Sequence, residues 1–462
     1  MTPSPKPTEN LDAINSRAFN LRSQGRAREA IAAFREGIAA FPQEAGLHNN
    51  LAVTLQENGD PDGALSAYRE ALRYDPTLWA AHFGAGVLLM NRSEFTQAES
   101  FLTDAVKLAP ELVAAHLALY ELLQIRGARD GALAHQAMAL QHQQLFSTIG
   151  AQPKREVLTV MAPGDWQANI PIDFLFEPVN TTLHKLYLVG GNQFATLHLP
   201  KYDVLINAIA ESDEAEHALR LCEQLIAAQT KPVINQPAAV RGTNRERLPA
   251  ILHATGCNIP PTLRLSRETL EQGNVPLQVP FIVRPVGSHA GRGLEKIDAL
   301  SDLPAYLAKI ADSELYITSF VDYSDPDDGY FRKFRIIIVD GVPFPFHMAI
   351  SKNWMVHYYN APMAENAWMR AEEEQFLAHF ENLFTLSQQR CLRDIAKALH
   401  LEYVGIDCAI DREGRILVFE ADPGVIVHVS DSIELYPYKH EYVPRIFRAV
   451  ERMIDVRIAR SN

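Results

Sequence analysis

Residues 403–424 are YVGIDCAIDREGRILVFEADPG, two apolar runs on either side of a polar turn that contains Glu-Gly. The two runs are rich in β-branched residues, and the turn between them predicts an antiparallel hairpin. A two-residue turn places Asp407 directly across from Glu420, with Asp422 on the same face as Glu420. A three-residue turn shifts the register by one residue and sends the two carboxylates to opposite faces.

The acidic residues of this hairpin are candidate metal ligands. Carboxylates that face each other across neighbouring strands repel. A divalent cation removes this penalty, and Mg²⁺ takes one or two carboxylates together with substrate phosphates. We therefore interpret Asp407, Glu420 and Asp422 as metal ligands. The alternative is that they are exposed acids, which the apolar residues between them disfavour.

Two stretches upstream supply positive charge. Strand alternation in 331–335 (FRKFR) puts Lys333 and Arg335 on one face, ahead of a buried run and an Asp-Gly turn. The apolar stretch 280–285 delivers Arg284, whose guanidinium can bind phosphate oxygens in a bidentate way. A solvated strand edge is the alternative for 331–335.

A glycine-rich loop follows the second of these stretches. Residues 286–293 (VGSHAGRG) contain three glycines, and glycine lets backbone N–H groups approach an oxyanion closely. The composition is typical of a phosphate-binding loop, although a glycine-rich hairpin turn shares it. The candidate ATP-binding residues of the loop are Gly287, Ser288, His289, Gly291, Arg292 and Gly293.

Two further segments are weak signals when taken alone. The apolar strand 315–321 (LYITSFV) has a polar pair at its centre and could receive an adenine ring. A helix after 233–237 (VINQP) carries arginines, although arginines on a helix are usually solvated. The candidates here are Thr318, Ser319, Phe320, Val321, Arg241 and Arg247, and Lys352 and His357 are weaker candidates downstream.

In this order the segments resemble the ATP-grasp superfamily, over about residues 157–452. The resemblance implies an α+β ATP-grasp domain preceded by an α/β unit. It implies that Arg284 stands where the family has a phosphate-binding Lys, and that residues 287–293 form the flexible phosphate loop. It also implies that Arg335 ends the D-x-R strand motif.

The resemblance further implies an activity. In this superfamily a carboxylate attacks the γ-phosphate of ATP, and a nucleophile, usually an amine, displaces phosphate from the acylphosphate. ATP and Mg²⁺ would be the cofactors, ADP and phosphate the products, and Arg284 and Arg335 the catalytic cations. The chain departs from the family pattern at Arg284 for Lys, at Lys333 for Asp, at Ser319 for Glu and at Asp422 for Asn.

The segment before this region is predicted to be a small α/β unit. Short β-branched runs alternate with one helical stretch, which indicates a parallel sheet. The expected strands are Val157–Met161, Leu186–Val189, Val204–Ile209 and Pro232–Asn235, and the expected helix is Glu214–Ala228.

A period of 34 residues runs through the first third of the chain. Prolines recur at Pro42, Pro76 and Pro110, and proline ends a helix. Small residues keep the same step at Ala18, Ala52, Gly86, Ala30, Ala64 and Ala98, and bulky ones at Phe34, Tyr68 and Leu102. The pattern resembles the tetratricopeptide repeat over about residues 11–145. In that family, stacked helical hairpins form a concave surface that commonly holds a peptide or a partner protein.

These patterns predict a multidomain chain. The expected parts are a disordered leader at 1–10, all-α repeats at 11–148, a linker at 149–156, the α/β unit at 157–240 and the ATP-grasp domain at 241–455. We expect a ligase that modifies a peptide or protein held by the repeats. The alternatives are a small-molecule carboxylate–amine ligase whose repeats only assemble the protein, for example as a homodimer, and a non-catalytic nucleotide-binding scaffold.

Composition limits the partners. The net charge of −13 over 462 residues argues against nucleic acid. The start of the chain has no apolar core typical of a secretory signal, and no apolar run has the length of a membrane span. The four cysteines are scattered, which favours reduced thiols and a cytoplasmic location.

Overall fold

The computed structural model describes residues 10–190, 198–288, 291–358 and 360–461. The chain forms two compact units, divided between Gln144 and Leu145. Residues 1–9 of the expected leader lie outside the described ranges. Within those ranges, no helix is long and apolar enough to cross a membrane.

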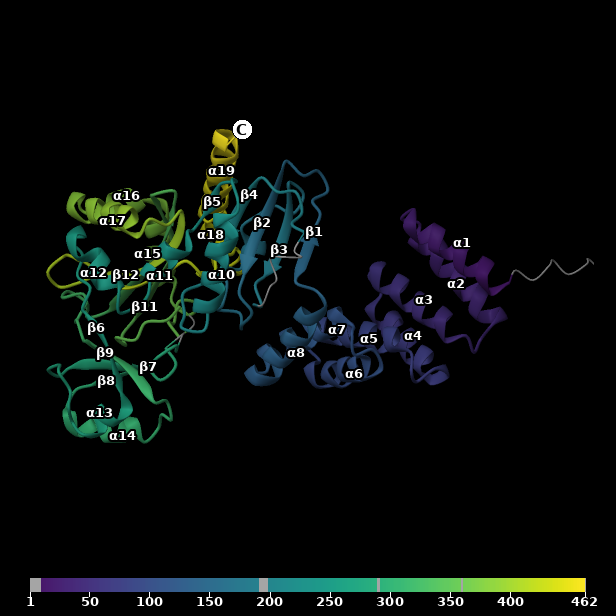
Figure 1. The fold of residues 1–462 in the computed structure, drawn as a ribbon, viewed down its shortest axis with the longest axis horizontal. Coiled ribbons are helices and arrows are strands. Elements are labelled where there is room, and N and C mark those ends of the chain that lie inside the picture. The colour runs from purple at the N-terminus through teal and green to yellow at the C-terminus, as the bar shows by residue number, and fades with distance from the viewer. Residues whose placement is uncertain (1–9, 191–197, 289–290, 359, 462) are drawn as a thin grey trace, which may run out of the picture. The chain divides into compact units, whose positions relative to one another are not determined.

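The first unit consists of stacked helical hairpins, as the 34-residue period predicts (Figure 1). The small residues of the period allow close helix contact: Ala18 and Ala52 are fully buried, and a Cβ added at Gly86 would lie 2.7 Å from Cγ of Leu102. The helices are α1 (Leu11–Ser23), α2 (Ala27–Ala40), α3 (Ala45–Glu57), α4 (Pro61–Tyr74), α5 (Trp79–Asn91), α6 (Phe95–Leu108), α7 (Val113–Ile125) and α8 (Arg129–His142).

A histidine in each of three hairpins fastens the chain at the helix-ending proline. Nε2 of His48, His82 and His116 lies 2.9 to 3.0 Å from the carbonyl oxygen of the proline six residues earlier. Each proline lies two residues beyond the end of a helix, so its carbonyl is outside the helical hydrogen-bond pattern and the histidine satisfies this backbone acceptor. These histidines share the 34-residue period but were not among the predicted repeat positions.

The second unit begins with a five-stranded sheet in the order β1-β3-β2-β4-β5. Its strands are β1 (Leu145–Thr148), β2 (Arg155–Met161), β3 (Thr181–Tyr187), β4 (Val204–Asn207) and β5 (Val233–Ile234), and α10 (Glu216–Ala227) connects the last two. The four later strands pair in parallel, as predicted. Strand β1 pairs antiparallel with β3, so the expected repeat boundary at residue 148 runs four residues into this sheet.

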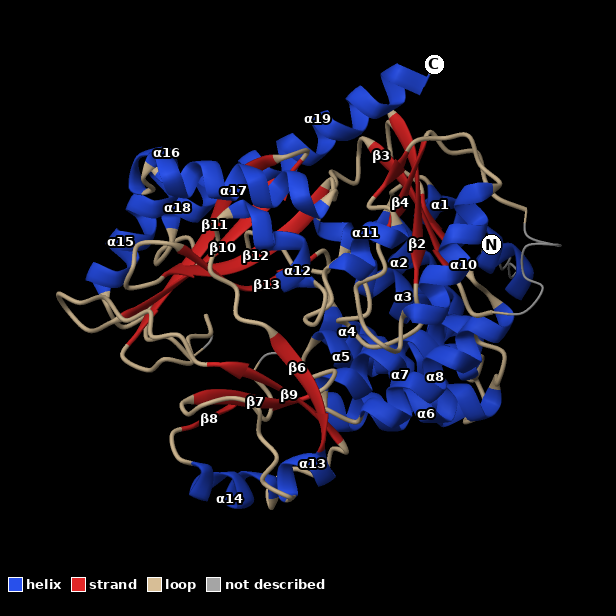
Figure 2. Cartoon of the chain, turned by 60° about the vertical axis from the view of Figure 1, so that its left-hand side comes forward, coloured by secondary structure: helices blue, strands red, loops and turns tan. Residues whose placement is uncertain are grey.

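Two four-stranded antiparallel sheets follow (Figure 2). The small sheet has the order β6-β9-β7-β8, and α13 (Arg267–Glu271) and α14 (Leu303–Leu307) cover it. Its strands are β6 (Thr262–Ser266), β7 (Phe281–Pro285), β8 (Glu295–Ile297) and β9 (Glu314–Ser319). The large sheet has the order β11-β10-β12-β13, with strands β10 (Phe331–Val339), β11 (Val342–Ser351), β12 (Tyr403–Ile410) and β13 (Ile416–Asp422).

Further helices pack against the large sheet. In Figure 2 they lie on one side of it, and the small sheet lies on the other. They are α15 (Ala367–Ala378), α16 (Phe380–Leu383) and α17 (Leu386–Leu399), followed by α18 (Pro437–Tyr442) and α19 (Pro444–Ser461) near the end of the chain.

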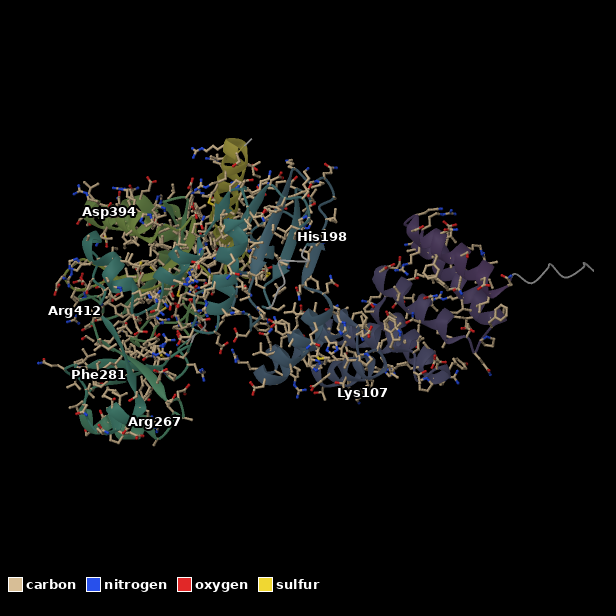
Figure 3. The ribbon with its side chains drawn as sticks, in the orientation of Figure 1. Lys107, His198, Arg267, Phe281, Asp394 and Arg412 are labelled. Carbon is tan, nitrogen blue, oxygen red and sulfur yellow. The ribbon has the colours of Figure 1, made fainter. Side chains whose placement is uncertain are left out.

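One hydrophobic core joins the five-stranded sheet to the large sheet. It includes Leu158 of β2 and Ile336 of β10, both fully buried. The expected boundary between residues 240 and 241 falls inside α11 (Pro237–Gly242), so the two parts are packed as one body. The small sheet has a core of its own around Phe281, which Figure 3 labels. It is therefore a separate lobe of the second unit.

The β12–β13 hairpin uses a longer turn than the two-residue one considered above. Next to the turn, Ile410 pairs with Ile416, which is the register of an odd-numbered loop. A β-bulge then leaves Phe419 without a partner and shifts the register by one residue. Asp407 therefore pairs with Glu420, although the turn alone would have separated them. In the view of Figure 3, Arg412 at the tip of this hairpin lies between Asp394 on α17 and the small sheet.

Candidate active site

Four polar side chains form a row across the large sheet. His347, Arg335, Asp407 and Glu420 are successive strand partners on β11, β10, β12 and β13. Residues paired at one register position point to the same face of a sheet. The row therefore brings a candidate catalytic cation and two candidate metal ligands onto one face.

Asp407 is the centre of an ion-pair cluster. Arg335 donates from Nε and Nη2 to its two carboxylate oxygens at 2.6 and 2.9 Å, and Nζ of Lys333 lies 2.6 Å from Oδ2. The Asp407 side chain is only 1% exposed. Burial by itself raises the pKa of Asp407, but Arg335 and Lys333 hold it well below its usual range. Asp407 is thus an ionised carboxylate whose partners are two internal cations.

The two acids of β13 differ from each other. Arg245 forms an ion pair with Glu420. Burial raises the pKa of Glu420, but Arg245 and the more distant Lys333 lower it to about 2. No Lys or Arg of the described residues pairs with Asp422, which accepts a hydrogen bond from the Gly424 amide at 2.7 Å. Burial and the charge of Glu420 raise the pKa of Asp422 to about 6.

Arg284 extends from β7 of the small sheet and contacts the glycine-rich loop. Its Nε donates to Oγ of Ser288 at 2.9 Å, and its Nη2 donates to the carbonyl oxygen of Ser288. Burial lowers the pKa of Arg284 to about 10, and the charge of Arg245 acts in the same direction. Among the described residues no carboxylate forms an ion pair with Arg284, so this partly buried cation has no direct counter-ion there.

The glycines of the loop are required by its backbone. A Cβ at Gly293 would lie 2.7 Å from Cδ of Pro285, and the Gly293 carbonyl accepts a hydrogen bond from Tyr306 at 2.9 Å. Positive φ angles of 68°, 76° and 65° occur at Gly287, Gly291 and Gly293, a region that side chains disfavour. The loop returns beside β7, where Arg284 starts. Of its other candidates, His289 lies outside the described residues, and Arg292 is exposed.

The candidates at the end of β9 lie on the small sheet beside aromatic side chains. Thr318 donates from Oγ1 to the carbonyl of Pro261 at 3.1 Å. The Phe320 ring meets Trp354 edge-on at 5.6 Å, and Nζ of Lys296 lies 4.7 Å from its centre. Ser319 is exposed, and Val321 is partly buried against Tyr323 and its neighbours. The described contacts of these residues do not include the acids of the row.

Two of the arginines and lysines named from the sequence have partners elsewhere. Arg241 pairs with Glu216 at 2.8 Å and with Glu223. Arg247 is exposed at the start of α12 (Leu248–Leu252). Lys352 donates to the carbonyl oxygen of Asp328 at 2.9 Å. His357 is half-buried, and burial, Lys333 and Arg335 lower its pKa.

Sequence reasoning missed Arg245 and His347. Arg245 lies between Arg241 and Arg247, and no sequence pattern distinguishes it from these two arginines. A two-residue turn at Asp340-Gly341 pairs Val339 with Val342. Counted outward along both strands without a bulge, this register would place Phe346 opposite Arg335. A bulge between Arg335 and Ile336 places His347 there instead.

His347 is a buried polar residue with a ring nitrogen that is unsatisfied within the described ranges. Its Nδ1 has no hydrogen-bond partner among the residues that the structure describes, and its ring centre lies 4.6 Å from that of Tyr358. Burial lowers the pKa of His347 well below its usual value, and Arg335 and Lys439 lower it further. The ring is therefore neutral beside the ion-pair cluster.

The acids fit a divalent cation in part. Asp407 and Glu420 are direct cross-strand neighbours, and Mg²⁺ can be held by two carboxylates when phosphates supply further oxygens. Within the described residues, however, no three His, Cys, Asp or Glu side chains converge closely enough to hold a metal on their own. The protein thus offers part of a coordination shell, and a ligand must supply the rest.

Asp422→Asn is expected to stabilise the ligand-free protein at neutral pH but not in acid. An ordinary Asp ionises near pH 4, whereas burial and Glu420 raise the pKa of Asp422 to about 6. The folded state therefore binds this proton more tightly than the unfolded state, and stability falls as pH rises from about 4 to about 6. Above that range the variant should gain on the order of 1–3 kcal/mol.

The measurement is the urea midpoint in EDTA at about pH 4 and pH 7.5. Asp394→Asn serves as the control, since Asp394 is an exposed acid that pairs with Lys397 at 3.2 Å on α17. A stabilisation by Asp422→Asn that is equal at both pH values would contradict the burial argument.

Comparisons with known proteins bear mainly on the first unit. Residues 49–112 match the tetratricopeptide repeat family model, so the predicted repeat is confirmed over that range. Curated proteins contain no match to the chain.

Solved structures give weak likenesses. The VanG D-Ala:D-Ser ligase from Enterococcus faecalis is 12% identical, with 66% of this chain and 99% of that chain covered at a TM-score of 0.41. MamA is 16% identical, with 29% and 78% covered at a TM-score of 0.28. YrrB, a tetratricopeptide protein with an unusual peptide-binding site, is 20% identical, with 28% and 68% covered at 0.26. Scores this low leave the activity of this chain to be judged from its own residues.

Proposed function

We propose that the second unit is an ATP-dependent ligase that activates a carboxylate as an acylphosphate and passes it to a nucleophile such as an amine. One observation carries the proposal. Acids of the large sheet, Asp407 and Glu420, meet the cations Arg335, Lys333 and Arg245 at one place, and Arg284 of the small sheet is close enough for its charge to act on Glu420. Such a cluster of cations suits a polyphosphate.

The chemistry asked of these residues is positioning and charge stabilisation. Arg284, Arg335 and Lys333 would hold phosphate oxygens and spread the charge that develops during phosphoryl transfer. Asp407 and Glu420 would hold Mg²⁺, which would supply Lewis-acid stabilisation of the phosphate charge. The glycine-rich loop beside Arg284 would cover the phosphates and exclude water from the acylphosphate.

The test is a screen for substrate-dependent phosphate release with purified full-length protein, ATP and Mg²⁺. Candidate carboxylates are offered with free amino acids, peptides or proteins as acceptors, and products are identified by mass spectrometry. Release of ADP together with a new amide or ester supports the proposal. Formation of AMP, or nucleotide binding without turnover of any acceptor, would overturn it in favour of another reaction class or of a scaffold.

We further propose that the repeats hold a peptide or protein substrate, because residues 49–112 match the tetratricopeptide repeat family model and stacked repeats form concave binding surfaces. Deletion of residues 1–144 is expected to raise KM for that substrate at least about tenfold, through loss of effective concentration, with kcat little changed. Steady-state kinetics with the full and shortened chains measure this. An unchanged kcat/KM would show that the repeats do not deliver the substrate.

The end point of the deletion matters. A cut at residue 150 would also remove β1, which pairs with β3 over Leu145–Thr148. The shortened chain would then lose an edge strand, and reduced activity could reflect damage to the sheet. Equal thermal stability of the second unit in both chains is therefore the control.

A further inference from the structure

We infer that the carboxylates of the candidate site are masked by internal cations, so that metal-free nucleotide binds first and only then creates the site for Mg²⁺. This inference rests on the proposed function and adds an order of binding to it. It follows from the partners that each charged group has in the ligand-free protein.

The first step concerns Asp407. Both of its oxygens are taken by the Arg335 guanidinium at 2.6 and 2.9 Å, and one also by Lys333 at 2.6 Å. A carboxylate has about four lone-pair positions, and three of them accept here. A metal ion approaching Asp407 would have to displace at least one of these two cations. The two positive charges would then face a third, divalent one at short range in a buried site.

The second step concerns Glu420. Arg245, which lies in the segment between α11 and α12, forms an ion pair with the Glu420 carboxylate. The side chains of Arg245 and Glu420 are 25% and 31% exposed, so this pair is more accessible than that of Asp407. The two acids most suited to Mg²⁺ are thus both neutralised from within. The absence of a preassembled three-ligand group among the described residues agrees with this.

The third step concerns the cation left over. Arg284 is partly buried, forms no ion pair with a carboxylate in the described part of the chain, and directs its donors at Ser288. Its pKa is lowered by burial and by Arg245, which means that its charge is poorly compensated. An anion is the ligand that this position favours. A triphosphate that binds Arg284 can then draw Arg245, Lys333 and Arg335 away from their carboxylates.

The exchange conserves charge pairing. Each cation that leaves a carboxylate gains a phosphate oxygen, and each freed carboxylate gains the metal. Arginine and lysine have several donors each, so they can follow the phosphates without large backbone motion. Asp407 and Glu420 would therefore hold the metal only after the phosphates have drawn the cations away.

The experiment consists of two titrations of the full-length protein. In the first, Mn²⁺ without nucleotide is added, and free Mn²⁺ is followed by electron paramagnetic resonance. In the second, ATP is added in excess EDTA and followed by calorimetry. The wild-type protein is expected to bind ATP in EDTA and to show no Mn²⁺ binding at submillimolar concentrations.

A double variant is expected to bind Mn²⁺ better and metal-free ATP less well than the wild type. Arg245→Met with Lys333→Met frees Glu420 and uncovers part of Asp407, so Mn²⁺ without nucleotide should bind at least about tenfold more tightly than to wild type, while ATP in EDTA binds more weakly. Arg264→Met is the matched control, because Arg264 pairs with Asp213 and Glu314 outside the site. Arg245→Met alone, at the more exposed pair, covers the case in which the double variant does not fold.

The outcomes separate the two proposals. Tight Mn²⁺ binding by wild type without nucleotide, or Arg245→Met with unchanged Mn²⁺ affinity, overturns the masking and leaves the ligase proposal standing. ATP that binds only in the presence of metal overturns the order of binding in the same way. Failure of the wild-type protein to bind ATP under either condition overturns the ligase proposal and this inference with it.

Discussion

Replacement of Glu420 by Gln is expected to reduce ATP turnover at least about 100-fold while the fold is kept. Glu420 lies opposite Asp407 on neighbouring strands, and the two carboxylates would hold the Mg²⁺ together. Glutamine preserves size and shape but removes the charge that attracts a hard cation. The measurement is ADP formation with the acceptor that the screen identifies, together with circular dichroism and the thermal unfolding midpoint.

The same charge change away from the site provides the control. Glu413 is in the turn of the same hairpin and pairs with Arg415, and Glu413→Gln should keep full activity. If the Glu420→Gln variant turns over ATP at a rate within a few-fold of wild type, Glu420 is not a metal ligand. Loss of activity accompanied by a lower unfolding midpoint would point to a structural role, because Glu420 also holds Arg245.

Local patterns carried much of the prediction. The 34-residue period specified helical hairpins, because small residues are needed wherever two helices cross, and Ala18 and Ala52 are fully buried. The β-branched runs specified the parallel strands β2 and β4 within a few residues. Both depend on interactions between residues that are close in sequence or repeated along it, which a single sequence displays.

Register was harder to predict, because bulges depend on the whole sheet. Phe419 is the extra residue in β13, and a second bulge after Arg335 shifts β11 by one position. Each bulge moves a functional side chain onto the face of the row. Nothing in the composition of either strand marks the bulge, so Asp407 and Glu420 were placed together for an incorrect reason and His347 was not found.

The cations of the site show a second limit of prediction from the sequence. Arg241, Arg245 and Arg247 lie within seven residues, and their side chains have different environments. Only the fold decides that Arg241 pairs with Glu216 while Arg245 reaches Glu420 across the second unit. The sequence showed that positive charge was available in this segment, and the tertiary packing selected which residue carries it to the acids.

Lys439→Met is expected to destabilise the protein by about 3–5 kcal/mol near pH 7.5. Lys439 is 2% exposed, and its Nζ lies 3.4 Å from Glu373 and 3.2 Å from Asp431. The ammonium also lies 4.1 Å from the ring centre of Tyr358. Methionine fills similar volume but leaves two carboxylates without their cation, and the fully buried Glu373 has no access to water.

The loss should be smaller in acid. Burial already raises the pKa of Glu373, and removal of the Lys439 charge would raise it further. A raised pKa means that the folded state binds the proton more tightly, so the variant regains stability as pH falls toward that of an ordinary Glu, near 4.3. Urea unfolding at about pH 5 and pH 7.5 tests the sign. Lys397→Met, at an exposed pair with Asp394, should change stability by less than about 0.5 kcal/mol at both.

A second substitution distinguishes charge from packing. Glu373 accepts hydrogen bonds from the Met348 amide at 3.1 Å and from Tyr438 at 2.6 Å. Adding Glu373→Gln to Lys439→Met removes the uncompensated charge, keeps one side-chain oxygen for the Met348 amide and places an NH2 group where it can donate to the Tyr438 hydroxyl, so the double variant should be more stable than the single one at pH 7.5. If the double variant is no more stable than the single one, the uncompensated charge of Glu373 is not the cause of the loss. Because Met348 follows His347 on β11, the same cluster fixes the strand that ends the row of the candidate site.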